Sequence, residues 1–431
     1  MKKYIVSVLF VLSCLLLFTS CSQEVNRAAS DPEGTLIGQE EQTSVPVSQV
    51  KTAFTKEELL ADYDQCWELL EENYPFFPVL EKHGIDVQGV KESYRQTLME
   101  RVTDANGLYT LLQQMFVYME GLAHLGVMPP QVVLSLQYGP EMQNQSDLGP
   151  REKLFHDAQT IATYNALLEF LPDASGNLDH CIETRYYPEL KAAHIHFKTF
   201  SYPEEENSVV GEYLAQLEDE ECPVDHVIID ITGNGGGDIY NVIHDAIAPL
   251  GGGSWSYTYY FADSPVNQEM LLPTFEYLTT LGYHYDVGVP QKLTGAPTEP
   301  AFTKELGMTH SLECTIHFPS LEKTYAENAH RWLLIDRCYS AAEGLSSFCK
   351  DSGWATVVGR RGKGDGDFLS PFAVRLDQTG LLVWFSTTTK ANTDGSLNAE
   401  IGSPPDYLCR PSESPLRKCM ALIEDQSESN E

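Results

Sequence analysis

The chain has 431 residues, of which 28 are Lys or Arg and 62 are Asp or Glu, so its formal charge at pH 7 is −34. This acidic balance excludes a non-specific nucleic-acid binder, because such proteins neutralise phosphates with a basic surface. Hydrophobic residues make up 42% of the chain, which is enough to build cores and excludes a wholly disordered protein. At about 150 residues per domain, the length predicts two or three domains.

Residues 1–21 place two lysines before an apolar run from Tyr4 to Phe18, which is the layout of a secretory signal. The run is too short to serve comfortably as a membrane-spanning helix. The segment from Phe18 to Cys21 resembles a bacterial lipobox, in which the cysteine is acylated and becomes the mature N-terminus. The resemblance implies a lipoprotein signal peptide over 1–21 and a protein held outside the cytoplasmic membrane by lipid on Cys21. An ordinary signal peptide would instead leave a secreted protein.

A polar stretch over 22–52 is typical of a flexible linker. The segment 53–130 is predicted to be a helical N-terminal subdomain. A capping-box pattern at Thr55 to Glu58 opens a first amphipathic helix, and apolar residues at helical spacing mark a second one from Leu108 to Leu122. The pattern over 131–185 is ambiguous, and we treat it as a connecting region of uncertain fold.

From 186 to 408 short apolar runs alternate with helical patterns, which predicts an α/β core with a largely parallel sheet. Strands are expected within 191–200, 227–231, 332–335 and 355–358, and helices within 209–217, 239–250 and 341–350. The C-terminal tail, 409–431, ends in an acidic stretch that is expected to be disordered.

Eight cysteines follow Cys21 without any CxxC spacing, so a zinc ribbon is not indicated. Cys409 and Cys419 are the one pair that we would suggest as a disulfide. His194 and His196 alternate on an expected strand and could share a metal, but no carboxylate stands at a recognisable ligand spacing. We therefore predict structural roles for both histidines and no metal site. The motif from Asp365 to Asp367 is interpreted as a solvated turn.

Two loops between a strand and a helix carry the candidate chemistry. Asp230 to Asp238 contains three consecutive glycines whose N–H groups could face an anion, although the same glycines could simply form a tight turn. Asp238 stands where a dinucleotide fingerprint needs glycine. Ser340 could present a nucleophilic hydroxyl at a helix N-terminus, yet Ser340 and Glu343 also form a capping-box pattern, which this segment alone favours. His124 ends the second helix, where a lone histidine is usually structural.

Taken in chain order, five segments resemble the serine peptidases of the C-terminal processing peptidase, tail-specific protease and tricorn family. They are the helix ending at Leu122-Ala123-His124, the strand Ala192 to Phe200, the D-x-R-x-N-x-G-G-like turn Asp230 to Gly237, the S-A-x-E segment Ser340 to Glu343, and the N-x-E-x-G-x-x-P-D segment Asn398 to Asp406. The resemblance implies a crotonase-like (ββα) peptidase core within a mixed α/β fold.

Many members of that family use a Ser-Lys dyad, but Asp365 occupies the position of the lysine here. The tricorn-like arrangement fits better: it implies Ser340 as nucleophile, His124 as general base, and Glu400 as the group that orients the imidazole or its water-linked partner. The resemblance further implies an oxyanion hole formed by the N–H groups of Gly236 or Gly237 together with Ala341.

These assignments predict a lipid-anchored, extracytoplasmic serine endopeptidase that acts on peptides or proteins, without a cofactor and without nucleic-acid partners. No stretch between His124 and Ala192 has the length and pattern of the family's PDZ domain. Ala123, Leu125 and Thr232 depart from the family's usual residues around the site. The alternative is therefore a catalytically inactive member that binds peptides or small ligands.

Overall fold

The computed structural model describes residues 50–138, 148–170, 181–202, 208–280, 282–369 and 371–430. The predicted signal peptide, Cys21 and nearly all of the predicted linker lie outside these residues. No helix in the described ranges combines the length and the apolar character needed to cross a membrane.

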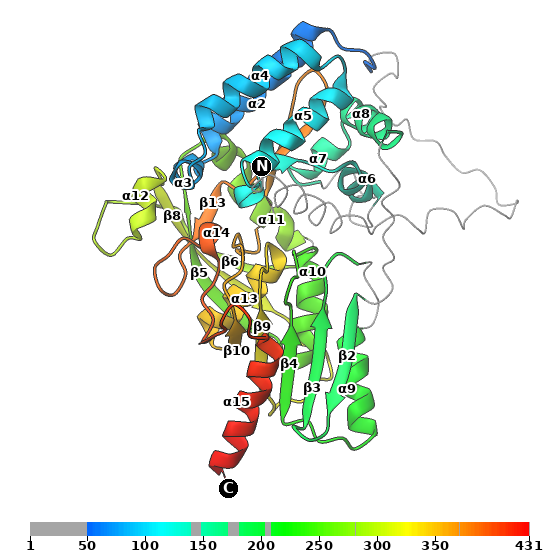
Figure 1. Ribbon diagram of the computed structural model, residues 1–431, viewed down its shortest axis with the longest axis vertical. Coiled ribbons are helices and arrows are strands. Elements are labelled where there is room, and N and C mark those ends of the chain that lie inside the picture. The colour runs from blue at the N-terminus through cyan, green and yellow to red at the C-terminus, as the bar shows by residue number, and fades with distance from the viewer. Residues whose placement is uncertain are drawn as a thin grey trace, which may run out of the picture.

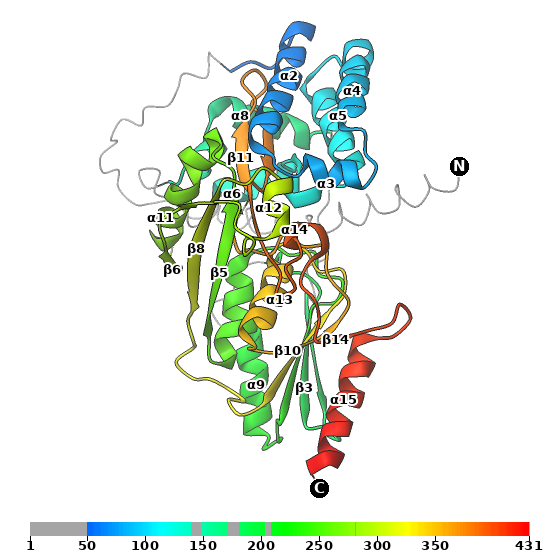
Figure 2. The ribbon, with the colours of Figure 1, turned by 90° about the vertical axis from the view of Figure 1, so that its left-hand side faces the viewer.

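The N-terminal part is helical, as the sequence predicts, and it lies at one end of the molecule (Figures 1 and 2). It comprises α2 (Lys56–Asn73), α3 (Phe77–Lys82), α4 (Val87–Arg101) and α5 (Ala105–Tyr118), followed by α6 (Pro130–Tyr138), α7 (Glu152–Phe155) and α8 (Ala158–Leu168). The capping box at Thr55 and Glu58 forms, so the predicted start of the first helix is confirmed.

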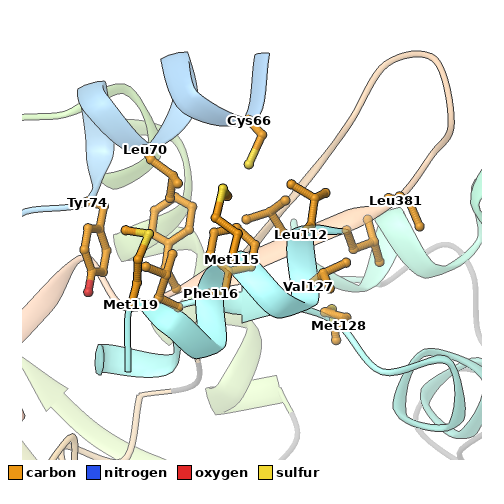
Figure 3. Close-up of a cluster of buried hydrophobic side chains, with 14 of the residues drawn as sticks. Cys66, Leu70, Tyr74, Leu112, Met115, Phe116, Met119, Val127, Met128 and Leu381 are labelled. Atoms are coloured by element: carbon orange, nitrogen blue, oxygen red, sulfur yellow. The ribbon is translucent and has the colours of Figure 1, made fainter. Parts of the chain in front are cut away.

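Helix α5 is fixed by a cluster of buried apolar side chains. In Figure 3, Leu112 and Met115 of α5 lie beneath Cys66 and Leu70 of α2, and Leu381 approaches from a β-hairpin of the core. Burial of side chains of this size contributes about 1.5–3 kcal/mol each. The cluster therefore holds the helix that leads into the turn carrying His124.

The core contains a six-stranded sheet in the order β14-β10-β9-β4-β3-β2. Its strands are β2 (Ile182–Tyr187), β3 (Ala192–Phe197), β4 (His226–Asp230), β9 (His330–Ile335), β10 (Thr356–Gly359) and β14 (Tyr407–Leu408). All neighbours are parallel except β2 and β3. The predicted, largely parallel sheet is therefore confirmed.

Two further sheets complete the architecture. One has the order β13-β5-β8-β6, from β13 (Thr388–Lys390), β5 (Gly253–Phe261), β8 (His310–Phe318) and β6 (His284–Val287), with β7 (Gln291–Lys292) beside β8. The other has the order β1-β12-β11, from β1 (Gly126–Val127), β12 (Leu382–Phe385) and β11 (Phe372–Arg375). Because β1 follows His124 directly, this small sheet joins the helical part to the core.

The helices of the core are α9 (Val209–Asp219), α10 (Ile239–Asn241) continued by η5 (Val242–Ile247) and η6 (Ala248–Leu250), η7 (Asn267–Leu271) with α11 (Leu272–Thr280), α12 (Ala301–Glu305), α13 (Ala341–Ser352), α14 (Asn398–Ile401) and α15 (Pro415–Asn430). Helix α13 contacts β9 and β10 on one side and β5 on another, and its residues 341–349 are all buried. A helix buried on every side is held rigidly, which fixes the residue at its N-terminus.

Two predictions for the C-terminal region are wrong. The acidic end is helical rather than disordered, because Cys419 and Ile423 of α15 are buried in an apolar cluster with Trp332 and Val358 of the sheet. Cys409 belongs to the same cluster, but both cysteines are free thiols.

Candidate active site

Three neighbouring parallel strands deliver three of the site's loops. The glycine-rich turn follows β4, Ser340 follows β9 and Asp365 follows β10, and these strands lie in the order β10-β9-β4. The carboxyl ends of parallel strands share one edge of a sheet, where α/β proteins commonly bind ligands. Segments far apart in the sequence therefore meet at one place.

Ser340 occupies the N-cap position of α13 with φ 56° and ψ −128°. This left-handed conformation is rare for a residue other than glycine and is often found at functional sites. The side chain makes no capping hydrogen bond. Instead, its Oγ lies 2.8 Å from His124 Nε2. The capping-box interpretation of Ser340 and Glu343 is therefore wrong, because the hydroxyl is turned away from its own helix.

His124 comes from a tightly wound turn after α5. Glu120, Gly121, Ala123 and His124 all have positive φ, between 52° and 63°. Among the hydrogen bonds that hold the turn, the His124 N–H donates to the hydroxyl of Tyr339 (2.7 Å), and the Ala123 carbonyl accepts from the N–H of Ser386 (2.8 Å). The rings of His124 and Tyr339 also lie against each other, with centroids 4.7 Å apart. These contacts aim the imidazole at Ser340.

The carboxylate on the other side of the imidazole belongs to Asp365. Its Oδ2 forms a hydrogen bond with His124 Nδ1 and accepts a second one from the Ser386 hydroxyl at 2.7 Å. The Asp365 side chain is only 2% exposed. The sequence-based interpretation of Asp365 to Asp367 as a solvated turn is thus wrong, because both carboxyl groups are buried.

Glu400, which the resemblance placed behind His124, bonds Lys82 and lies against His83 instead. Its Oε1 accepts from Lys82 Nζ at 2.7 Å and lies 3.4 Å from His83 Nε2, both next to α3. The structure assigns to Asp365 the position that the resemblance implied for Glu400. The signal for it was present in the sequence: an ionisable residue between two glycines, at the family's lysine position.

The expected oxyanion groups separate into two kinds. The Gly236 N–H donates to the side-chain oxygen of Asn234 at 2.8 Å, so it already has an acceptor. Within the described part of the chain, the N–H groups of Gly237 and Ala341 have none. A Cβ on Gly236 would lie 2.8 Å from Ser340 Cβ and 3.1 Å from Ala341 N. The lack of a side chain at Gly236 therefore lets its loop approach Ser340 closely. The N–H groups that remain available to an oxyanion are those of Gly237, next to Gly236, and of Ala341, next to Ser340.

Two buried carboxyl groups near the site were not identified from the sequence. Burial, with the charge of Asp365 second, raises the pKa of Asp367 to about 7, and its Oδ2 accepts from the Thr388 hydroxyl at 3.0 Å. Burial raises the pKa of Glu343 to about 7 as well. Glu343 lies one turn after Ser340 on α13. Perturbed carboxyl groups of this kind cluster around functional sites.

The paired histidines do not form a metal centre in the described residues. His194 Nε2 lies 3.3 Å from Asp230 Oδ2, and its ring stacks on that of His196 with centroids 6.4 Å apart. No group of three or more His, Cys, Asp or Glu side chains in those ranges could hold an ion. Burial raises the pKa of Asp230, but the hydrogen bonds with His194 and with Thr232, whose N–H donates to Asp230 Oδ1, outweigh this effect, so the pKa lies below its ordinary value. This pair therefore supports the start of the glycine-rich turn.

A serine hydroxyl on a histidine that is in turn bonded to a buried carboxylate is the arrangement of nucleophilic acyl transfer. Comparison with known families agrees with it. The model of peptidase family S41 matches residues 191–409, and that of the tricorn protease C1 domain matches residues 55–117. The chain belongs to peptidase family S41. It is a serine peptidase of the hydrolase class, as the sequence predicted.

No curated protein matches the chain. Among solved structures, mature CPAF is similar at 14% identity and a TM-score of 0.46, covering 82% of this chain and 92% of its own. A lipoprotein from Streptococcus agalactiae has 11% identity and a TM-score of 0.45, covering 89% and 100%. The photosystem II D1 C-terminal processing protease has 14% identity and a TM-score of 0.39, covering 86% and 97%.

Proposed function

We propose that this S41 member is an active endopeptidase whose catalytic triad is Ser340, His124 and Asp365. The observation that carries the proposal is the continuous pair of hydrogen bonds from Ser340 Oγ through the two nitrogens of His124 to the buried Asp365 carboxylate. A binding protein that had lost its activity would have no need to keep a strained serine and a buried carboxylate on either side of one imidazole.

The mechanism proceeds in two halves. As Ser340 Oγ bonds to the peptide carbonyl carbon, its proton passes to His124 Nε2, and Asp365 stabilises the resulting imidazolium through Nδ1. The carbonyl oxygen gains negative charge and accepts hydrogen bonds from the N–H groups of Gly237 and Ala341. His124 then returns the proton to the leaving amine as the C–N bond breaks. Water attacks the acyl-enzyme with His124 again as base, which releases the acid and restores Ser340.

We also propose that the enzyme works outside the cytoplasmic membrane, anchored by lipid on Cys21. The support is the charged, apolar and cysteine-ended order of residues 1–21. The net charge of −34 favours basic over acidic peptides during encounter, which concerns association rates and not the bonds made in the site.

Hydrolysis of an unbiased library of internally quenched peptides tests the activity. Protein lacking residues 1–21 is compared with a Ser340→Ala variant of equal thermal stability, and both are treated with a fluorophosphonate that labels activated serines. We expect cleavage and labelling by the first protein and neither by the variant. If the unaltered protein neither cleaves nor labels, the catalytic proposal fails and direct measurement of peptide binding tests the alternative of an inactive binding module.

The anchor has a separate test. The full-length chain is expressed in a bacterium supplied with labelled palmitate, beside a Cys21→Ser variant. We expect label and membrane association in the first and loss of both in the second. Label that persists in the variant, or a protein that stays unlabelled and soluble in both cases, contradicts the anchor.

A further inference from the structure

The turn that carries Asp365 requires support from outside itself. Gly364 has φ 89° and Asp365 has φ 58°, so two successive residues are in the left-handed region. For a residue other than glycine this conformation is energetically unfavourable and persists only where surrounding groups impose it. One such group is the main chain of the nucleophile, since the Ser340 N–H donates to the Gly364 carbonyl at 3.2 Å.

Asn398 supplies contacts on both sides of Asp365. Its side-chain oxygen accepts from the Gly366 N–H at 3.0 Å. Its main-chain oxygen lies against Gly364, where an added Cβ would come within 1.9 Å of it. Asn398 is 1% exposed, and its amide nitrogen donates to Asn392 Oδ1 at 2.9 Å. A buried amide with these partners has one available orientation, so the position of the turn is fixed.

The same side chain reaches the helix of the nucleophile. Asn398 Nδ2 lies 3.3 Å from Oε1 of Glu343, which is fully buried, and the main chain of Glu343 packs against Gly366 so closely that a Cβ there would lie 2.4 Å from Glu343 C. The chain of contacts is therefore closed: from Ser340 along α13 to Glu343, then through Asn398 to the Asp365 turn, and back through His124 to Ser340.

We propose that Asn398 is a positioning residue of this peptidase, which holds the Asp365 carboxylate on His124 Nδ1 by fixing the turn at Gly364 and Gly366. The proposal rests on the proposed function, because it assigns Asn398 an effect on catalysis that passes through Asp365. It touches neither substrate nor the reacting atoms. Its loss therefore lowers kcat and leaves KM nearly unchanged.

A double-mutant cycle tests this route. In enzyme counted by fluorophosphonate titration, Asn398→Ala is expected to lower kcat by about ten- to a hundredfold with KM within about twofold. In an Asp365→Asn background, where there is no carboxylate left to position, the same change is expected to lower kcat by less than about threefold. The proposal would be overturned if Asn398→Ala lowered kcat by the same factor in the wild-type and Asp365→Asn proteins. It would also be overturned if the change lowered only the fraction of enzyme that the fluorophosphonate titrates and not kcat. Asn398→Ser, whose hydroxyl is too short to reach Gly366, replaces Asn398→Ala if that variant does not fold.

Two further measurements separate positioning from general stability. Asn398→Asp keeps an oxygen acceptor for the Gly366 N–H but loses the amide donor to Asn392 Oδ1 and Glu343 Oε1, so it is expected to recover only part of the lost kcat. Ser208→Ala is the matched control: Ser208 is also buried, donates to Asp245 Oδ1 at 2.8 Å and accepts from the Gly211 N–H at 3.2 Å, but it lies in the core at the start of α9, and none of its hydrogen bonds in the described residues reaches the triad or the helical part. It is expected to leave kcat unchanged.

The deshielded NMR signal of the proton between His124 and Asp365 gives a readout that does not depend on turnover. It is expected to persist in Ser208→Ala and to shift or broaden in Asn398→Ala. If the wild-type protein proves inactive, the proposed function fails and this signal alone decides the role of Asn398. An unshifted signal in Asn398→Ala overturns that role.

Discussion

Replacing Asp365 by Asn tests the assignment of the triad most directly. The variant keeps the volume of the side chain and removes its charge. Two orientations of the new amide are possible. If its oxygen faces His124, the imidazole keeps its tautomer but loses the negative charge that stabilises the imidazolium. If its nitrogen faces His124, Nδ1 must accept, and Nε2 then carries the proton and cannot take one from Ser340.

The two orientations bracket the expected loss. Opposite charges about 4 Å apart interact by about 4 kcal/mol at an effective dielectric constant of 20, which corresponds to about a thousandfold in rate. The wrong tautomer costs about ten-thousandfold in a serine-histidine-aspartate triad. Because the side chains of Asp365 and His124 are only 2% and 9% exposed, water does not replace the lost charge. We therefore expect kcat/KM to fall by about 10³ to 10⁴.

Glu400→Gln is the matched control. It also removes one carboxylate, but the Glu400 carboxylate bonds Lys82, whose side chain is 57% exposed, and exposed ion pairs contribute about 0–1 kcal/mol. We expect kcat/KM within about fivefold of the unaltered enzyme. Both variants are assayed on one quenched peptide, with active sites counted by fluorophosphonate and folding checked by thermal melts. A large loss in Glu400→Gln with a loss below tenfold in Asp365→Asn would refute the assignment.

Three further variants address stability and the shape of the site. The Glu343 pKa of about 7 lies above its ordinary value of 4.5, so its contribution to stability is complete below pH 4.5 and is lost as the pH rises through 7. Urea titrations give the free energy of unfolding of both proteins. Between pH 5 and 8.5 the value for Glu343→Gln should rise by about 3 kcal/mol relative to that of the unaltered protein, and an equal pH dependence of the two values would contradict a raised Glu343 pKa. Gly236→Ala places a Cβ 2.8 Å from Ser340 Cβ at φ 102°, so labelling by the fluorophosphonate should slow by at least about tenfold, and an unchanged rate would show that the loop can yield. Tyr339→Phe leaves the His124 N–H without its acceptor, which should cost about 1–3 kcal/mol of stability in the same titrations, and a cost below about 0.5 kcal/mol would mean that this bond does not hold the turn.

The sequence predicted the architecture because the relevant signals are local. Strand-forming runs such as 227–231 and 332–335 are short and apolar, and the helices between them have recognisable starts and ends. Gly353, for example, ends α13 in the left-handed conformation, as a glycine after a helix commonly does. These features depend on residues that are neighbours in the chain, so they can be predicted without knowledge of the tertiary structure.

The carboxylate of the proposed triad is brought to His124 by contacts between distant parts of the chain, and local sequence patterns missed it for that reason. Asp365 lies 241 residues from His124 in the chain. In the sequence it was interpreted only as the replacement of the family's lysine, and not as a hydrogen-bond partner of the histidine. The capping-box pattern at Ser340 failed in a similar way. Its glutamate is drawn into a buried network with Ser403 and Asn398, which no local pattern records.

In the proposed mechanism, the position of His124 makes docking of the helical part a condition of catalysis. Ser340 and Asp365 both follow strands of one sheet, whereas His124 follows α5 and belongs to the helical part. The core alone would therefore present a nucleophile and a carboxylate without a base between them. Contacts far from the reacting atoms then affect catalysis. One example is Asp62 in α2, whose carboxylate accepts hydrogen bonds from the N–H groups of Gln378 and Thr379 at the β11–β12 turn, both at 2.8 Å. Since that hairpin also pairs with β1 immediately after the histidine, each bond that secures it also limits how far the imidazole can move from the serine.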